Sequence, residues 1–295
     1  MALQMGQKTA VQRLALIGCG LIGGSFALAL KAAGAVAEVT GSSGSPASAH
    51  KALELGAIDR VASSAAQAVQ GADAVLLAVP VAATQAVLEE IAPHLAPQVL
   101  VMDAGSTKRD VLAAMQAALP QHLGYCVPAH PIAGKEKSGV AHAESALFKG
   151  RRVILTPLTQ SSDDAIARAQ QLWELTGARV SRMSPLQHDE TFAAVSHLPH
   201  LLAFAYMAGL MDQPGGEALL AHAGSGFRDF TRIAASDPVM WRDILLANRG
   251  PVLAQAQAFG DALEHLAQTL RSGDGAALQA QIEAVSRRRS AWPAA

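Results

Sequence analysis

The chain has 295 residues, of which 51% are hydrophobic and 16% charged, and its net charge is −1. This composition excludes a disordered chain, and 23 basic against 24 acidic residues leave no concentrated basic face for nucleic acid. The two cysteines, Cys19 and Cys126, cannot form a disulfide framework, so we expect a reducing, cytoplasmic setting. At about 150 residues per domain, the length predicts two domains.

Residues 14–30 carry no charge and follow Lys8 and Arg13, as in a signal peptide or a membrane span. Four glycines in the middle of this stretch, at positions 18, 20, 23 and 24, indicate a break between two short elements. We therefore expect neither a leader nor a membrane partner.

A short apolar run at residues 12–17 is typical of a buried strand, and an apolar helix is predicted to run to about residue 33. The turn between them has the pattern GxGxxG. Its first glycine permits a tight turn, its second lets the backbone approach a pyrophosphate, and its third lets helix and strand pack closely. The helix N-terminus would supply N–H donors to the phosphates. The predicted cofactor contacts here are Gly18, Gly20, Leu21, Ile22 and Gly23.

Strands and helices are predicted to alternate along the first half of the chain, which implies right-handed crossovers and a parallel, doubly wound sheet of Rossmann type. The predicted strands are residues 37–41, 74–79, 99–103 and 125–129, and the predicted helices are residues 48–55, 81–95 and 109–119. Two later strands, at 152–155 and 178–181, flank a helix at about 162–176, and we expect them to extend the same sheet.

Ligands of such sheets bind at the carboxyl ends of the strands. Beside the glycine turn, these ends include Val79 and Pro80, the segment that contains Ser106, and His130. We expect Val79 and Pro80 to contact the cofactor.

The second strand lacks the acidic residue with which NAD-binding folds hold the ribose 2′-hydroxyl. Glu38 has about the right spacing from the glycines, but it stands at the start of the strand. Without a carboxylate, Ser42 and Ser43 could donate hydrogen bonds to a 2′-phosphate, and Lys51 could add charge. The sequence modestly favours NADP over NAD, and the alternative is a small polar loop that accepts either cofactor.

Ser106 and Lys108 follow the strand at 99–103. A serine at this place is expected to cap the next helix. Lys108 opposes the dipole of that helix in its first turn, which indicates a site that needs positive charge.

His130 is the predicted general base. It follows an apolar strand and precedes Pro131, which favours an extended backbone. A charged loop at residues 134–139 could cover a polar ligand. Imidazole titrates near neutral pH and suits removal of a proton from an alcohol. The alternative is a buried structural histidine.

A second, helical domain is expected from residue 185, which gives domains at residues 1–184 and 185–295. Ser184, Pro185 and Gln187 form a capping-box pattern, and a long apolar helix with a kink at Pro199 follows. Histidines at positions 197 and 200 share nearly one face of it. No third ligand has a recognisable spacing, so we expect substrate contacts and no metal.

The rest of the helical half is predicted as a loop at residues 224–232 with Arg228 and Arg232, a helix from Pro238, and helices over 251–287 interrupted near 273–275. The arginines could pair with neighbouring acids, but a carboxylate substrate calls for a guanidinium. Helices this apolar are expected to bury a face against a second subunit, and the last five residues are expected to fray.

Together these segments resemble the prephenate/arogenate dehydrogenases of tyrosine biosynthesis. The resemblance spans residues 14–265 and rests on the blocks at 103–108, 130–139, 196–200 and 229–243, in this order. It implies an α/β Rossmann-type domain followed by an all-α dimerisation domain. It also implies oxidative decarboxylation of prephenate or arogenate to 4-hydroxyphenylpyruvate or tyrosine, with hydride transfer to NAD or NADP.

The resemblance implies roles for individual residues. His130 would accept the proton of the ring hydroxyl, Ser106 would orient His130 and the nicotinamide, and Arg232 would hold a substrate carboxylate. Family members that use NAD have an aspartate where Ser43 stands. Two other readings stay open, a different hydroxyacid dehydrogenase or imine reductase and a non-catalytic dinucleotide sensor. The remaining residues expected to line the substrate pocket are Ser196, His197 and His200.

Overall fold

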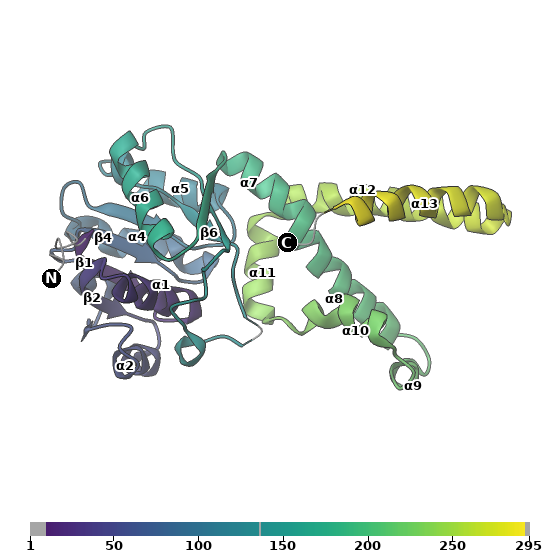
Figure 1. Ribbon diagram of the computed structural model, residues 1–295, viewed down its shortest axis with the longest axis horizontal. Coiled ribbons are helices and arrows are strands. Elements are labelled where there is room, and N and C mark those ends of the chain that lie inside the picture. Colours follow the sequence, from purple (N-terminus) through teal and green to yellow (C-terminus); the bar gives the residue numbers. More distant parts are fainter. Residues whose placement is uncertain (1–9, 136, 293–295) are drawn as a thin grey trace, which may run out of the picture.

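A computed structural model describes residues 10–135 and 137–292, and Figure 1 shows a sheet-containing amino-terminal half joined to a helical carboxyl-terminal half. The long helix that begins with α7 (Pro185–Phe192) leaves the first half and enters the second. The Ser184 hydroxyl accepts a hydrogen bond of 3.1 Å from the N–H of Gln187, and Pro185 occupies the first helical position. The capping pattern predicted at this point is confirmed.

Five parallel strands form the first sheet, in the order β3-β2-β1-β4-β5. Along β1, Leu14 and Leu16 join one apolar core while Ala15 and Ile17 join another, so both faces of the sheet are buried. This is the expected condition of a doubly wound parallel sheet, and the predicted fold class is confirmed. The strands are β1 (Val11–Ile17), β2 (Val36–Ser42), β3 (Arg60–Val61), β4 (Ala74–Leu77) and β5 (Leu100–Asp103).

Helices cover both faces of this sheet. Side chains of α1, α2 and α6 belong to the core that contains Leu14, and side chains of α3, α4 and α5 belong to the core that contains Ile17. The sequence predicts neither β3 nor α3, because two strand residues and four helical residues are too few to show a period. The helices are α1 (Leu21–Ala32), α2 (Pro46–Glu54), α3 (Ala65–Ala68), α4 (Thr84–Ile91), α5 (Arg109–Ala118) and α6 (Asp163–Leu175).

The prediction that the later strands extend the first sheet is wrong. Strands β6 (Ala129–Pro131), β7 (Arg152–Leu155) and β8 (Arg179–Arg182) form a separate three-stranded sheet, in which β6 runs antiparallel to β7. An isolated bridge between Val101 and Cys126 is the link to the first sheet. Pro128 has no N–H to continue this ladder, and the N–H of Ala129 bonds instead to the Asp103 carboxylate at 3.0 Å. His130 consequently lies inside a short strand rather than at an open strand end.

The helical half follows the predicted order, with one exception. Residues 224–232 form a helix, α10 (Ser225–Thr231), and a 3-10 turn from Arg232, so the predicted flexible loop is wrong. Gly224 serves as the N-cap of that helix rather than as a break. The interruption near residue 273 is confirmed, because Gly273 ends α12 with a φ of +72°. The other helices are α8 (Leu198–Met211), α9 (Gly216–Leu220), α11 (Pro238–Ala247), α12 (Arg249–Ser272) and α13 (Gly275–Ala291).

The helical half exposes much apolar surface. Helices α12 and α13 lie side by side and project away from the sheet (Figure 1). Several of their apolar side chains, such as Leu263 and Val285, are exposed. The continuous helix Pro185–Met211 is long and apolar enough to span a membrane by length and composition, and only 17% of its apolar window is buried. Apolar surface on this scale marks an interaction site. The predicted fraying of the last five residues concerns mainly 293–295, which lie outside the described residues.

Candidate active site

The glycine turn joins β1 to α1, which confirms the predicted break in the uncharged stretch. Gly18 has a φ of +100°, and a Cβ there would stand 2.2 Å from the carbonyl oxygen of Ala78. A Cβ on Gly23 would stand 2.3 Å from the carbonyl oxygen of Gly18. These two glycines are required by the tight turn and by the close packing of helix on strand, as predicted.

Gly20 differs from its neighbours, because a Cβ there would meet nothing within 4 Å. It is the N-cap of α1, with no capping side chain among the described residues and no acidic residue in the first turn. The N–H groups of Leu21 and Ile22 therefore begin a helix whose end is open and partly positive. The turn fits a diphosphate: the helix supplies donors, and the backbone at Gly20 leaves room for close approach. Val79 lies beside this turn, since the Cβ position of Gly18 is 3.2 Å from its nitrogen, and Pro80 follows on the surface.

The end of β2 carries no carboxylate. Glu38 faces Arg13 and Arg60 at 3.8 and 3.2 Å, so its structural role is an ion pair at the sheet edge. Lys51 forms an ion pair of 2.8 Å with Glu54 of its own helix. The positive charge that was expected to assist a 2′-phosphate is therefore already paired with a carboxylate.

The two serines at the end of β2 differ in access. The side chain of Ser42 is buried, and its carbonyl accepts the Gly18 N–H at 2.8 Å. Ser43 is only half-buried, with its hydroxyl 3.4 Å from the N–H of Ser45. Ser43 is therefore the more accessible hydroxyl for a ribose or its phosphate.

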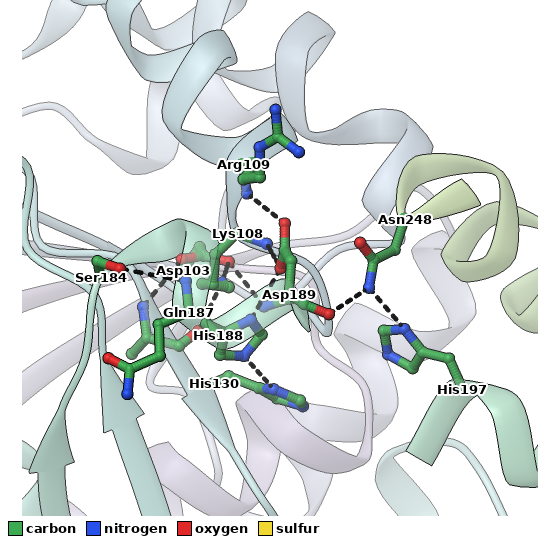
Figure 2. A network of polar contacts seen from close by, with 12 residues as sticks. Asp103, Lys108, Arg109, His130, Ser184, Gln187, His188, Asp189, His197 and Asn248 are labelled. Atoms are coloured by element: carbon green, nitrogen blue, oxygen red, sulfur yellow. Dashed lines mark hydrogen bonds and ion pairs between the residues drawn. The ribbon is translucent and has the colours of Figure 1, made fainter. Parts of the chain in front are cut away.

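A chain of three side chains ends at His130. Nδ1 of His130 lies 2.8 Å from Nε2 of His188, and Nδ1 of His188 lies 2.8 Å from Oδ1 of Asp189 (Figure 2). Burial lowers the pKa of His130 well below its ordinary value of 6.5, and the positive charge of Lys108 is among the causes that lower it further. His130 is therefore neutral at physiological pH, which is the form that can accept a proton.

Asp189 connects the two halves of the protein. Its carboxylate accepts the backbone N–H groups of Lys108 and Arg109, at 2.9 Å each, so a side chain of α7 caps the N-terminus of α5. Burial alone would raise the pKa of Asp189, but hydrogen bonds from His188 and from these two N–H groups lower it overall. Asp189 is therefore ionised, and it occupies the capping position predicted for Ser106.

Lys108 is fully buried and does not face a ligand. Its Nζ lies 2.5 Å from Oδ2 of Asp103 and 2.8 Å from the carbonyl oxygen of Ala129. The pair ties the end of β5 to the strand that carries His130, so the charge of Lys108 at the helix start is matched by the Asp103 carboxylate. Ser106 does not cap α5, whose N-cap is Lys108, and within residues 10–135 and 137–292 its half-buried hydroxyl has no hydrogen-bond partner.

The predicted pair of histidines lies on either side of a change in helix geometry. A π-helical segment (Ala193–His197) separates α7 from α8, and such segments often occur at functional sites. Nδ1 of His197 lies 3.0 Å from Nδ2 of Asn248, which also donates to the carbonyl oxygen of Asp189 at 2.8 Å. Burial lowers the pKa of His197 to about 4, so this ring is neutral.

His200 stacks on Trp241, with ring centroids 3.5 Å apart, and its Nδ1 donates to the carbonyl oxygen of Ser196 at 2.9 Å. Burial lowers the pKa of His200, and the nearby charge of Arg232 lowers it further. His200 is among the groups that lower the pKa of His197, so the two histidines of the helical half lie close enough to influence each other. Within the described ranges, no group of three His, Cys, Asp or Glu side chains could hold a metal ion.

Sequence reasoning missed His188, Asp189, Trp241 and Asn248. The adjacent His188 and Asp189 stand among the polar residues Gln187, Glu190 and Thr191 of α7, so no signal in the sequence showed that these two alone are fully buried. Their partners are 58 and 81 residues away along the chain, so no local pattern shows the contact.

Both halves of the chain match models of one protein family. Residues 26–182 match the nucleotide-binding domain of prephenate dehydrogenase, and residues 184–284 match its dimerization domain. The chain is 37% identical to cyclohexadienyl dehydrogenase of Zymomonas mobilis, over 90% of this chain and 91% of that protein. It is 40% identical to prephenate dehydrogenase of Bacillus subtilis, over 81% of this chain and 64% of that protein. The crystal structure of A. aeolicus prephenate dehydrogenase in complex with hydroxyphenyl propionate and NAD+ has a TM-score of 0.90, with 36% identity, over 95% of this chain and 97% of that one.

Proposed function

The chain belongs to the prephenate dehydrogenase family and catalyses an NAD(P)-dependent oxidative decarboxylation in tyrosine biosynthesis, and within this activity we propose that His130 is the general base. The observation that supports this role is the environment of His130. Its ring is kept neutral by burial and by the nearby charge of Lys108, and its Nδ1 is held 2.8 Å from Nε2 of His188.

The proposed reaction removes a hydride and carbon dioxide from one ring, and the proton that His130 takes from the ring hydroxyl returns to the phenolate oxygen of the product. His130 accepts the proton of the ring hydroxyl, and Arg232 binds a substrate carboxylate with its guanidinium. The hydride leaves the carbon that carries the hydroxyl, and a bound nicotinamide would supply its acceptor. Departure of the carboxylate as carbon dioxide makes the ring aromatic and supplies the driving force. The protein therefore needs only to position the substrate, remove one proton and stabilise charge.

The other residues of the site are proposed to position the reactants. Ser106 follows the end of β5, on the same edge of the sheet as the glycine turn, and its unpartnered hydroxyl is free to bind the nicotinamide end of the cofactor or the substrate. Ser196 acts through its carbonyl, which holds His200 against Trp241. His197 and His200 line the pocket on the helical side. The boundary between the two domains is proposed to lie between residues 184 and 185, where Ser184 caps α7.

For the cofactor, we propose that the site accepts NADP at least as well as NAD. The glycine turn fits either dinucleotide, and the half-buried Ser43 at the end of β2 presents no carboxylate to a 2′-phosphate. The prephenate dehydrogenase of A. aeolicus was solved with NAD+, so NAD is the reference against which NADP should be compared.

The experiment that tests these assignments is a set of initial rates for prephenate and arogenate, each with NAD and NADP. We expect reduced cofactor to appear together with carbon dioxide. His130→Asn should lower kcat by about 10²–10⁴-fold, the usual share of general-base catalysis, with almost unchanged cofactor affinity. If neither substrate turns over, a different hydroxyacid or imine substrate, or a sensing role, takes the place of this proposal.

For the assembly, we propose a homodimer formed by the helical half, in the cytoplasm. The exposed apolar side chains on α8, α12 and α13 then face a second copy of the chain, and the apolar helix Pro185–Met211 is covered by protein rather than by lipid. Light scattering of the purified protein without detergent tests this. A monodisperse dimer is expected, and a monomer or a requirement for detergent would contradict it.

A further inference from the structure

The geometry points to His188 and Asp189 as positioning residues that fix the tautomer of His130, so that His130 offers an unprotonated Nε2 to the substrate. The inference rests on the proposed role of His130 as the base. It follows from the direction of each hydrogen bond in the chain Asp189–His188–His130 (Figure 2).

The first link is set by Asp189. Its ionised carboxylate can only accept hydrogen bonds, so Nδ1 of His188 must carry the hydrogen in their 2.8 Å contact. Burial lowers the pKa of His188 despite the opposing effect of Asp189, so this ring is neutral and holds a single ring hydrogen. Nε2 of His188 is therefore left as an acceptor.

The second link follows from the first. Nε2 of His188 lies 2.8 Å from Nδ1 of His130, and one of the two atoms must donate. Because Nε2 of His188 has no hydrogen, Nδ1 of His130 has one. A neutral His130 then has a bare Nε2, the nitrogen that can take a proton from an alcohol.

The position of the chain is fixed from both halves of the protein. Asp189 accepts the N–H groups of Lys108 and Arg109, and the amide of Asn248 donates to its main-chain carbonyl. The ring of His188 also packs on Phe192, one turn further along α7, with centroids 4.5 Å apart. His188 and Asp189 are fully buried, so water does not compete for these bonds.

The arrangement also prepares the site for the charge that the reaction creates. When Nε2 of His130 takes the proton, the ring becomes an imidazolium and both of its nitrogens donate. Its Nδ1–H is already bonded to His188, which is polarised by the Asp189 carboxylate. No side chain has to move to stabilise the new charge.

Two substitutions of His188 separate this role from a structural one. In His188→Gln, the amide oxygen reaches the place of Nε2 and can still accept the Nδ1–H of His130. In His188→Asn, the shorter amide can donate to Asp189 but cannot reach His130. We expect His188→Gln to keep kcat within about tenfold of the wild type and His188→Asn to lower it by about 10²-fold or more, while KM and the Kd for NAD stay the same. His94→Gln, at an exposed histidine of the 3-10 turn Ala92–His94, is the matched control and should change nothing.

Asp189→Asn tests the direction of the hydrogen bonds. The Oδ1 atom that faces His188 also accepts the backbone N–H of Lys108, and Oδ2 accepts that of Arg109, so an amide NH₂ displaces one of these two hydrogen bonds whichever way it turns. In molecules whose NH₂ faces His188, the hydrogen of His188 moves to Nε2 and that of His130 moves to Nε2 as well, which blocks the base. We expect kcat to fall, by up to about 10⁴-fold where that orientation dominates, the size of the effect when a catalytic histidine takes the wrong tautomer in a serine protease.

Nitrogen NMR of protein labelled with ¹⁵N-histidine gives a readout that needs no substrate. The chain has 10 histidines, and the signals of His130 are identified by their loss in His130→Asn. Near neutral pH we expect hydrogen on Nδ1 and a bare Nε2 in the wild type, and the reverse or a mixture in Asp189→Asn. Hydrogen on Nε2 of wild-type His130, or equal loss of kcat in both His188 variants, would overturn the inference. Absence of turnover in the wild type would refute the proposed function and leave the NMR result to decide the tautomer.

Discussion

The buried pair of Lys108 and Asp103 gives a prediction for Lys108→Met. The methionine keeps the apolar part of the side chain and removes the ammonium. The Asp103 side chain, which is only 3% exposed, is then left without its cation. Removing one partner of a buried ion pair costs about 3–5 kcal/mol. Asp103 keeps two backbone donors, Gly105 and Ala129, so we expect the low end, about 3 kcal/mol. At about 2–4 °C per kcal/mol for a domain of 150–250 residues, Tm should fall by about 6–12 °C.

The assay is thermal unfolding followed by the fluorescence of Trp173, which is buried between Phe26 and Phe148 in the amino-terminal half. Lys51→Met is the matched control, because Lys51 makes an ion pair of 2.8 Å with Glu54 that is exposed on both sides, and Tm should not change. Lys108→Met should also raise the pKa of His130, since the charge of Lys108 is among the causes that lower it. Equal Tm shifts in Lys108→Met and Lys51→Met would refute the argument that burial makes the Lys108–Asp103 pair contribute more to stability than the exposed Lys51–Glu54 pair.

Four further predictions concern the cofactor and the substrate. Because burial and neighbouring charges lower the pKa of His130, kcat/KM should stay level at neutral pH and fall only below pH 6.5; a fall that begins above 6.5 would contradict this. Gly18→Ala should unfold the amino-terminal half, whereas Gly20→Ala should keep the wild-type Tm and weaken NAD binding, measured by titration calorimetry. Ser43→Asp should raise KM for NADP by about tenfold or more through charge repulsion and leave KM for NAD unchanged. Arg232→Ala should raise the substrate KM by about tenfold or more, the equivalent of about 1.5–3 kcal/mol for a charged hydrogen bond, with a smaller change in kcat; an unchanged KM would assign the carboxylate to another cation.

Local patterns predicted the elements that are defined by local physics. The alternation of apolar strands and helices gives the parallel sheet, and the glycine spacing gives the turn in which Gly18 and Gly23 leave no room for a Cβ. The cap at Ser184 and the interruption at Gly273 are likewise short-range features. Each is specified within a few residues, so sequence alone was sufficient.

The errors arise where a distant contact decides the structure. Pro128 and the side chain of Asp103 end the ladder beside β5 and turn β6 into a separate sheet, which the apolar run before His130 does not reveal. The position of Lys108 in the first turn of a helix indicates a need for positive charge, but it does not reveal that the charge is matched by Asp103, five residues earlier. The cap of α5 was predicted to be Ser106, but the hydrogen bond is accepted by Asp189 of the helical half, which is 81 residues from Lys108 along the chain.

The charges around the proposed base, His130, and the proposed carboxylate contact, Arg232, explain why the two roles are compatible. A pocket that binds a carboxylate needs a cation, and a cation near an imidazole lowers its pKa. Here Arg232 has this effect on His200, and Lys108 has it on His130, so the positive groups favour neutral rings. Asp103 neutralises Lys108 from within the sheet, and Asp189 is satisfied by two N–H groups, so neither carboxylate repels an acidic substrate with its full charge. A pocket of this kind can attract an acid and still hold an unprotonated base at neutral pH, which is what removal of a proton from a hydroxy acid requires.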